Sequence, residues 1–141
     1  MLVLLAMGMA AKSAHVKRAA LLLTVLVGIG TIPVYVSGEG AEEILEERPG
    51  VAEGLMENHE DRALVASIAT WVAAGLAVIG LLASLRGGNV PAWAASATLV
   101  ALLVSGALLY WAARPGGQIS HPEARPGFTA PPESGETGES E

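Results

Sequence analysis

Two histidines with neighbouring carboxylates are the side chains of this sequence with the clearest potential for chemistry. Glu60 directly follows His59, and one proline separates His121 from Glu123. Imidazole is the commonest protein ligand of transition metals and an axial ligand of haem iron, and a nearby carboxylate can orient it. We therefore treat His59 and His121 as candidate ligands of a haem or a divalent metal, with Glu60 and Glu123 as further candidate metal ligands or orienting groups.

A role in packing is the simpler interpretation of both histidines. Neither belongs to a spaced motif such as H-E-x-x-H, so the favoured interpretation is that His59 bonds the surrounding loop and His121 caps the last span. His15 lies in a basic segment and is expected to act only as an interfacial residue. The chain has no cysteine, which excludes disulfides, thiolate metal sites, cysteine nucleophiles and c-type haem attachment. There is no P-loop and no G-x-S-x-G motif, so no catalytic constellation is predicted.

The elements that position these residues are predicted to be membrane helices. The 141 residues are 52% hydrophobic and 16% charged, with a mean hydropathy of +0.49. Residues 19–36, 63–85 and 92–113 contain no Asp, Glu, Lys, Arg or His. Each run is long enough to cross a bilayer, which takes roughly 20 residues. A chain this short has too little polar surface to bury three such helices in a soluble core. The sequence therefore predicts an all-α integral membrane helical bundle.

The first apolar run is too short to be a full span. Residues 1–11 would form a helix of about 16 Å, roughly half of the hydrocarbon thickness. A signal peptide fits poorly, because the positive charges follow the run instead of preceding it. We expect three full transmembrane helices plus a truncated first helix whose beginning is missing from the chain.

Basic residues predict the orientation of these spans. Lys12, Lys17 and Arg18 precede residues 19–36, and Arg86 follows residues 63–85. If each run crosses once, these residues share one side, and the excess of basic residues marks that side as cytoplasmic. Residues 12–18 and 86–90 are then cytoplasmic, whereas the acidic segment, residues 37–62, and the C-terminus are outside.

The net charge of −6 argues against a nucleic-acid partner.

The acidic segment is predicted to be organised. Ala41, Ile44 and Leu45 indicate a short amphipathic helix lying at the interface on the outer face, and a second helix is expected to begin at Pro49. His59 lies on the apolar face of that second helix. Gly116 and Gly117 are expected to end the last helix. This divides the chain into a membrane domain, residues 1–113, a post-helix motif, residues 114–125, and a disordered acidic tail, residues 126–141.

An ordered set of short motifs resembles a known family. The set is Gly38-Glu39, Ala41-Glu42-Glu43, Pro49-Gly50-Val51, His59-Glu60, Gly116-Gly117-Gln118-Ile119 and His121-Pro122-Glu123. Its order and spacing, across roughly residues 1 to 125, resemble the bacterial membrane proteins of domain-of-unknown-function family 2231. The resemblance implies a four-helix membrane protein, in a family some of whose members are associated with redox modules. Family members usually begin with a histidine-containing H-F-P element, which this chain lacks; it would add a third histidine to the outer face.

Three functions follow from these patterns. The first is a structural or accessory component of the cell envelope, embedded in the lipid bilayer, whose acidic loop covers the outer face and binds an envelope protein. The second is a redox protein or a metal- or haem-binding protein that uses the outer-face histidines. The third is a transporter with a polar cavity at mid-membrane, lined by Ser67, Thr70, Thr98 and Ser105. The spans lack ionisable residues, which argues against a proton pump or an ion-coupled transporter.

Overall fold

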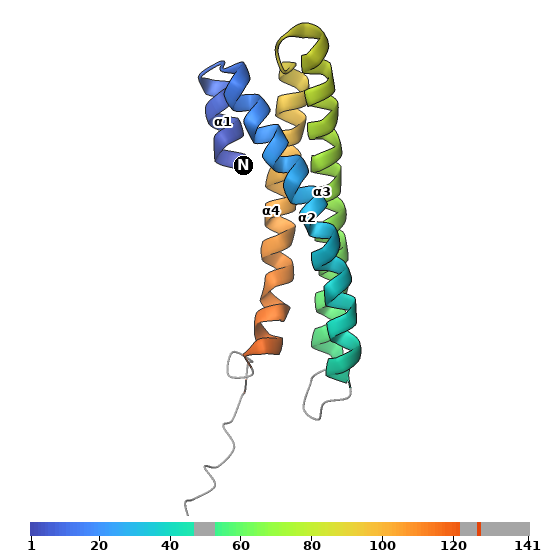
Figure 1. Cartoon of the computed structure of the whole chain (residues 1–141). Helices are drawn as coiled ribbons and strands as arrows, with labels where there is room; N and C mark the ends of the chain where they lie inside the picture. The colour runs from blue at the N-terminus through green and yellow to red at the C-terminus, as the bar shows by residue number, and fades with distance from the viewer. Residues whose placement is uncertain (47–52, 122–126, 128–141) are drawn as a thin grey trace, which may run out of the picture.

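Four helices make up the protein in a computed structural model that describes residues 1–46, 53–121 and 127. They are α1 (Leu2–Ala10), α2 (Ala14–Glu46), α3 (Glu53–Gly87) and α4 (Ala92–Ser120), and the described residues contain no strand (Figure 1). Three helices contain segments long and apolar enough to cross a membrane: Ala14–Gly38, Met56–Gly87 and Ala92–Gln118. The prediction of an all-α membrane bundle with three full spans and a short first helix is confirmed.

A tight turn joins α1 to α2 and lays the short helix against the first part of the long one (Figure 1). The backbone N–H of Ser13 donates to the Gly8 carbonyl, and that of Lys12 donates to the Met9 carbonyl. Lys12 has a φ of 52°, the left-handed conformation that ends many helices in this way. Gly8 allows the close return, because a Cβ there would lie 2.9 Å from the Lys17 backbone nitrogen.

The α3 and α4 helices are antiparallel and pack along most of their length (Figure 1). Most of the buried positions of α3 follow a repeat of three and four residues: Ala66, Thr70, Ala73, Ala77, Gly80 and Ser84. Opposite them, the buried positions of α4 include Ala94, Thr98, Leu102, Ser105 and Ala112. Such a repeat of mostly small side chains lets two membrane helices approach closely. Ala97 and Ala101, two further small residues of α4, are only half-buried.

Glycines mark the closest approach of α2 to the other helices. A Cβ on Gly28 would lie 2.4 Å from the Ala74 Cβ, so α2 crosses α3 at this pair. Nearer the other end of α3, a Cβ on Gly80 would lie 3.1 Å from a Leu21 methyl group and 3.3 Å from the Ala94 Cβ. Gly80 therefore sits where α2, α3 and α4 meet.

Two helix boundaries differ from the predictions. The separate amphipathic helix predicted in the acidic segment is wrong: α2 continues without a break through Pro33 to Glu46. Pro33 removes one backbone N–H donor from α2, and the glutamates that follow it are good helix formers. The helix therefore extends past the apolar run. The predicted stop at Gly116 is also wrong, since α4 continues to Ser120. A start at Pro49 and the acidic tail, residues 126–141, fall outside the described residues, apart from Gly127.

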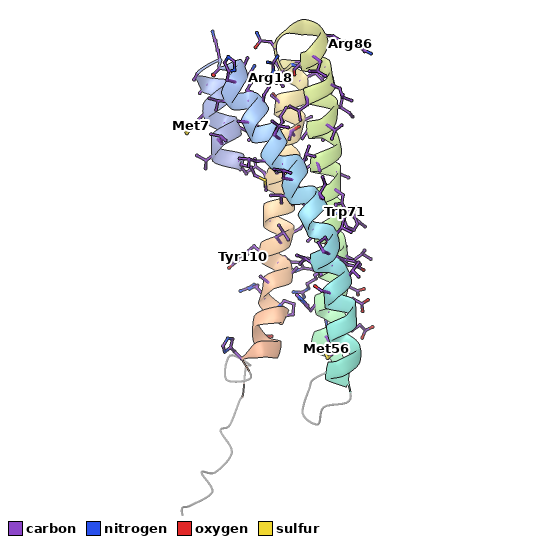
Figure 2. The ribbon with its side chains drawn as sticks, viewed as in Figure 1. Met7, Arg18, Met56, Trp71, Arg86 and Tyr110 are labelled. Carbon is purple, nitrogen blue, oxygen red and sulfur yellow. The ribbon has the colours of Figure 1, made fainter. Side chains whose placement is uncertain are left out.

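The two ends of the bundle differ in charge. The basic end, which we define by Lys12, Lys17, Arg18 and Arg86, brings together the α1–α2 and α3–α4 connections. Figure 2 shows Arg18 and Arg86 at this end and Met56 at the opposite one. We call the opposite end, formed by residues 37–46, 53–62 and 114–121, the acidic end. Residues 12–18 and 86–90 thus share one end, as the alternation of spans predicted.

Candidate functional site

His59 lies between α3 and α4 at the acidic end. Its Nδ1 is 3.0 Å from the Ala112 carbonyl oxygen. A carbonyl only accepts, so Nδ1 carries a proton and donates; in a neutral imidazole with this hydrogen bond, the lone pair is on Nε2. The ring rests on Gly116, where a Cβ would lie 2.9 Å from the His59 Cε1. Glycine at position 116 therefore provides the space that the imidazole occupies.

Arg62 makes a second contact on the same stretch of α4. Its side chain lies over the Trp111 ring, 4.3 Å from the ring centroid, and a guanidinium nitrogen donates to the Trp111 carbonyl at 3.4 Å. Proline at position 115 has no N–H, so the Trp111 carbonyl loses its usual donor four residues later. The Arg62 guanidinium donates to the Trp111 carbonyl in place of the missing N–H.

His59 and Arg62 act together because they are three residues apart and share one face of α3. Between them they bond two consecutive carbonyls of α4, those of Trp111 and Ala112, which are four and three residues before Pro115. We call this set of contacts the Pro115 clasp. It fixes the acidic end of α3 against α4. The simpler interpretation predicted that His59 bonds the surrounding loop, whereas its partner is a backbone carbonyl of α4.

The structure places the second candidate histidine elsewhere. His121 is exposed and caps α4, with its backbone N–H bonded to the Gly117 carbonyl. It lies five residues beyond Gly116, about 7.5 Å farther along the axis and rotated by about 140°. It is therefore on a different side of α4 from the residue that His59 contacts.

Of the two candidate carboxylates, only Glu60 lies within the described residues. Glu60 is exposed, and Glu123 lies outside the described residues. Among the described residues, no group of three or more His, Cys, Asp or Glu side chains could hold a metal ion. His59 Nε2 remains one available imidazole ligand, placed beside the clasp.

The hydroxyls considered for a mid-membrane cavity are packed between helices. Thr70 donates to the Ala66 carbonyl at 2.9 Å, so its one proton is used, and Ser105, at 2.7 Å, must donate to the Thr70 oxygen. Ser67 is buried, and the fully buried Thr98 hydroxyl has no hydrogen-bond partner in the described part of the chain. The Thr70–Ser105 bond therefore links α3 to α4 within the membrane.

The basic end contains contacts that the sequence did not predict. Arg18 donates to the carbonyls of Ser84, at 3.2 Å, and Gly88, at 2.7 Å, and the Lys17 ammonium donates to the Val90 carbonyl at 3.3 Å. Carbonyls at the C-terminal end of a helix lack helical donors and carry partial negative charge. Arg18 therefore adds a second donor to the Ser84 carbonyl, which already accepts from the Gly88 N–H. Together with Lys17 it also bonds the connection that follows α3.

Comparisons of the chain with models of known protein families, with curated proteins and with solved structures found no match. The resemblance to family 2231 therefore stays a prediction. The Pro115 clasp is the best-defined polar contact between helices at the acidic end. The pairing of Arg62 with Trp111 was not predicted, although Pro115 signals in the sequence that a carbonyl four residues earlier needs another donor.

Proposed function

We propose that this protein is a structural or accessory component of the cell envelope that binds a membrane or envelope partner through its acidic end. One observation carries the proposal. On the first turns of α3, His59 and Arg62 point to α4, whereas Glu57, Glu60 and Asp61 are exposed. The clasp therefore presents three carboxylates on a fixed helix, directed away from the bundle.

The partner that fits this surface carries lysine or arginine side chains near the membrane surface. Carboxylates on a fixed scaffold lose little conformational entropy when a cation binds, and opposite charges favour encounter and register. Nine of the 14 Asp and Glu residues of the chain lie between positions 39 and 61, so this part of the sequence carries most of the negative charge available to a cationic partner. The apolar spans then serve to hold this surface at the bilayer.

A cross-linking experiment tests the partner. The chain lacks cysteine, so Glu60→Cys carries a photoreactive maleimide at one position only. We expect illumination of native membranes to give one discrete adduct, which weakens when Glu57→Gln and Asp61→Asn are added. Lys12→Cys at the basic end is the matched control and should not give that adduct. An adduct of the same mass from both positions, or one indifferent to the two neutral substitutions, would contradict the proposal.

The proposal also includes an orientation, with the basic end in the cytoplasm and the acidic end outside. The distribution of Lys and Arg supports it. Asn89→Cys and Glu60→Cys place single thiols at exposed positions of the basic and acidic ends. A membrane-impermeant maleimide added to intact cells should label position 60 and leave position 89 unlabelled until the cells are opened. The reverse labelling would invert the assignment.

A redox protein or a metal- or haem-binding protein is the second candidate, favoured by the tautomer of His59. A histidine whose Nδ1–H is held by a backbone carbonyl presents Nε2 as a ligand in a fixed direction. Detergent-purified protein should then show a Soret band or a stoichiometric metal that is lost in His59→Ala. The same measurement on His121→Ala tests whether the second histidine contributes. Colourless, metal-free protein purified from cells supplied with haem precursors and transition metals would dismiss this candidate.

A further inference from the structure

Among the described residues, no carboxylate lies near the basic end to balance its positive charge. Residues 1–38 and 62–122 contain no Asp or Glu. Along α2, Glu39 is 21 residues from Arg18, about 31 Å at 1.5 Å per residue. Along α3, Asp61 is 25 residues from Arg86, about 37 Å. These separations are several times the screening length of about 8 Å at physiological ionic strength.

The hydrogen bonds at this end do not neutralise the charge. Arg18 and Lys17 bond to backbone carbonyls, which are neutral dipoles. The Arg18 Nε is buried and has no hydrogen-bond partner among the described residues. Lys12 and Arg86 are exposed. No carboxylate in residues 1–46 or 53–121, the described parts of the bundle, lies near enough to balance these four formal positive charges.

The position of these residues along the spans identifies the available anion. The three candidate spans end or begin at Ala14, Gly87 and Ala92, so the basic end lies where the hydrocarbon meets the lipid headgroups. Lys17 and Arg18 are one turn inside α2, where long basic side chains extend towards the interface. Trp93, on the first turn of α4, is 59% exposed, as expected for an aromatic residue at headgroup depth.

The first turn of α4 adds to the attraction for an anion. Pro91 precedes this helix and makes no side-chain cap, so the first backbone N–H groups of α4 lack that partner. The Lys17 ammonium is held at the adjacent Val90 carbonyl. A fixed ammonium beside the positive end of a helix dipole favours a phosphate oxygen.

We propose that the basic end is a binding site for the phosphate of an anionic phospholipid such as phosphatidylglycerol. Lys12, Lys17, Arg18 and Arg86 attract the headgroup, and the uncapped start of α4 lies beside Lys17. We choose a lipid over free phosphate because the apolar spans begin at this end and offer acyl chains a surface directly beside the cations. This inference is independent of the partner proposed for the acidic end.

The tryptophans allow a test at defined positions. A protein that keeps only Trp93, with Trp71→Phe and Trp111→Phe, reports on lipid at the basic end. Its fluorescence is measured in phosphatidylcholine nanodiscs that contain equal fractions of either brominated phosphatidylglycerol or brominated phosphatidylcholine. We expect brominated phosphatidylglycerol to associate about two- to fivefold more strongly, the scale of one cation near an anionic surface. A protein that keeps only Trp111 reports on the acidic end and should show no such preference.

Charge variants show whether the preference comes from the basic end. Lys12→Gln combined with Arg86→Gln removes two exposed cations and leaves the Lys17 and Arg18 caps in place, so the fold is retained. The preference at Trp93 should fall towards that of phosphatidylcholine. Arg114→Gln, which removes one exposed cation at the acidic end, is the matched control and should change nothing.

Three outcomes would overturn the proposal. The first is equal quenching by the two brominated lipids at Trp93, and the second is a preference that the double variant leaves unchanged. The third concerns the source of the phosphate. Inorganic phosphate is added at the same ionic strength as a sodium chloride control. If inorganic phosphate alone removes the preference, the site binds free phosphate and not a lipid.

Discussion

The crossing of α2 and α3 gives the most direct test of how the bundle is built. At Gly28 an added Cβ would lie 2.4 Å from the Ala74 Cβ. Carbon atoms in contact are optimally separated by about 3.5 to 4.0 Å. Gly28→Ala therefore forces the two helices apart by about 1.3 Å at this point, since neither methyl group can rotate away. Gly30→Ala is the matched control, because no atom lies within 4 Å of its added Cβ.

The expected magnitude follows from two opposing effects. Overpacking of a close contact costs about 1 to 3 kcal/mol, whereas replacing glycine by alanine within a helix gains up to about 1 kcal/mol. Both substitutions gain the stability of alanine over glycine in a helix, but only Gly28→Ala also has the cost of steric overlap. The difference between the two variants should therefore be about 1 to 3 kcal/mol, with Gly28→Ala the less stable.

A second substitution separates steric overlap from other causes. With Ala74→Gly in place, the nearest atom to the new Cβ at position 28 is the Ala74 Cα, at 3.9 Å, an ordinary contact. Unfolding is followed by circular dichroism and tryptophan fluorescence in mixed micelles of increasing dodecyl sulfate content. The double variant should recover most of the stability that Gly28→Ala loses. If Gly28→Ala matches Gly30→Ala, or if Ala74→Gly does not rescue it, the crossing at this pair is refuted.

Two further predictions concern the α3–α4 contact. Gly116→Ala should displace the imidazole that rests there and lower the midpoint of unfolding. Gly117→Ala is the control and should do neither, because its added Cβ has open space. Unchanged chemical shifts of the His59 imidazole in Gly116→Ala would contradict the clasp. Ser105→Ala and Thr70→Val, alone and combined in the same unfolding assay, should show a coupling of about 0.6 to 1.7 kcal/mol, the scale measured for hydrogen bonds between membrane helices. Strictly additive effects would show that the 2.7 Å contact contributes nothing.

The candidate site was predicted only in part. The residue type and spacing identified His59 as a polar residue on an apolar face, and a bonding role was one of two interpretations. Its actual partners, the Ala112 carbonyl and Gly116, are more than 50 residues away along the chain. Neither could be predicted without the register of α3 against α4. The same register determines that Ser105 meets Thr70, while Ala97 and Ala101 are only half-buried.

Local sequence patterns also failed to predict where two of the helices end. Pro33 and Gly116 are residues that often end helices, yet α2 and α4 continue past both. In α4 the carbonyl that Pro115 leaves without a helical donor is bonded by Arg62 of a neighbouring helix. A helix can thus continue where local sequence predicts an end, because tertiary contacts supply the missing hydrogen bond.

The sequence by itself determined that the chain is an all-α membrane protein with three full spans, because the length and hydrophobicity of each apolar run are local properties. It also determined that the Lys and Arg residues at positions 12–18 and 86 share one end, since antiparallel spans alternate. Only the tertiary structure decided which face of each helix is buried, where α2 crosses α3, and which backbone carbonyls Arg18, His59 and Arg62 bond. Those contacts depend on the rotation and register of helices distant in sequence, which the hydrophobicity of an almost uniformly apolar helix does not specify.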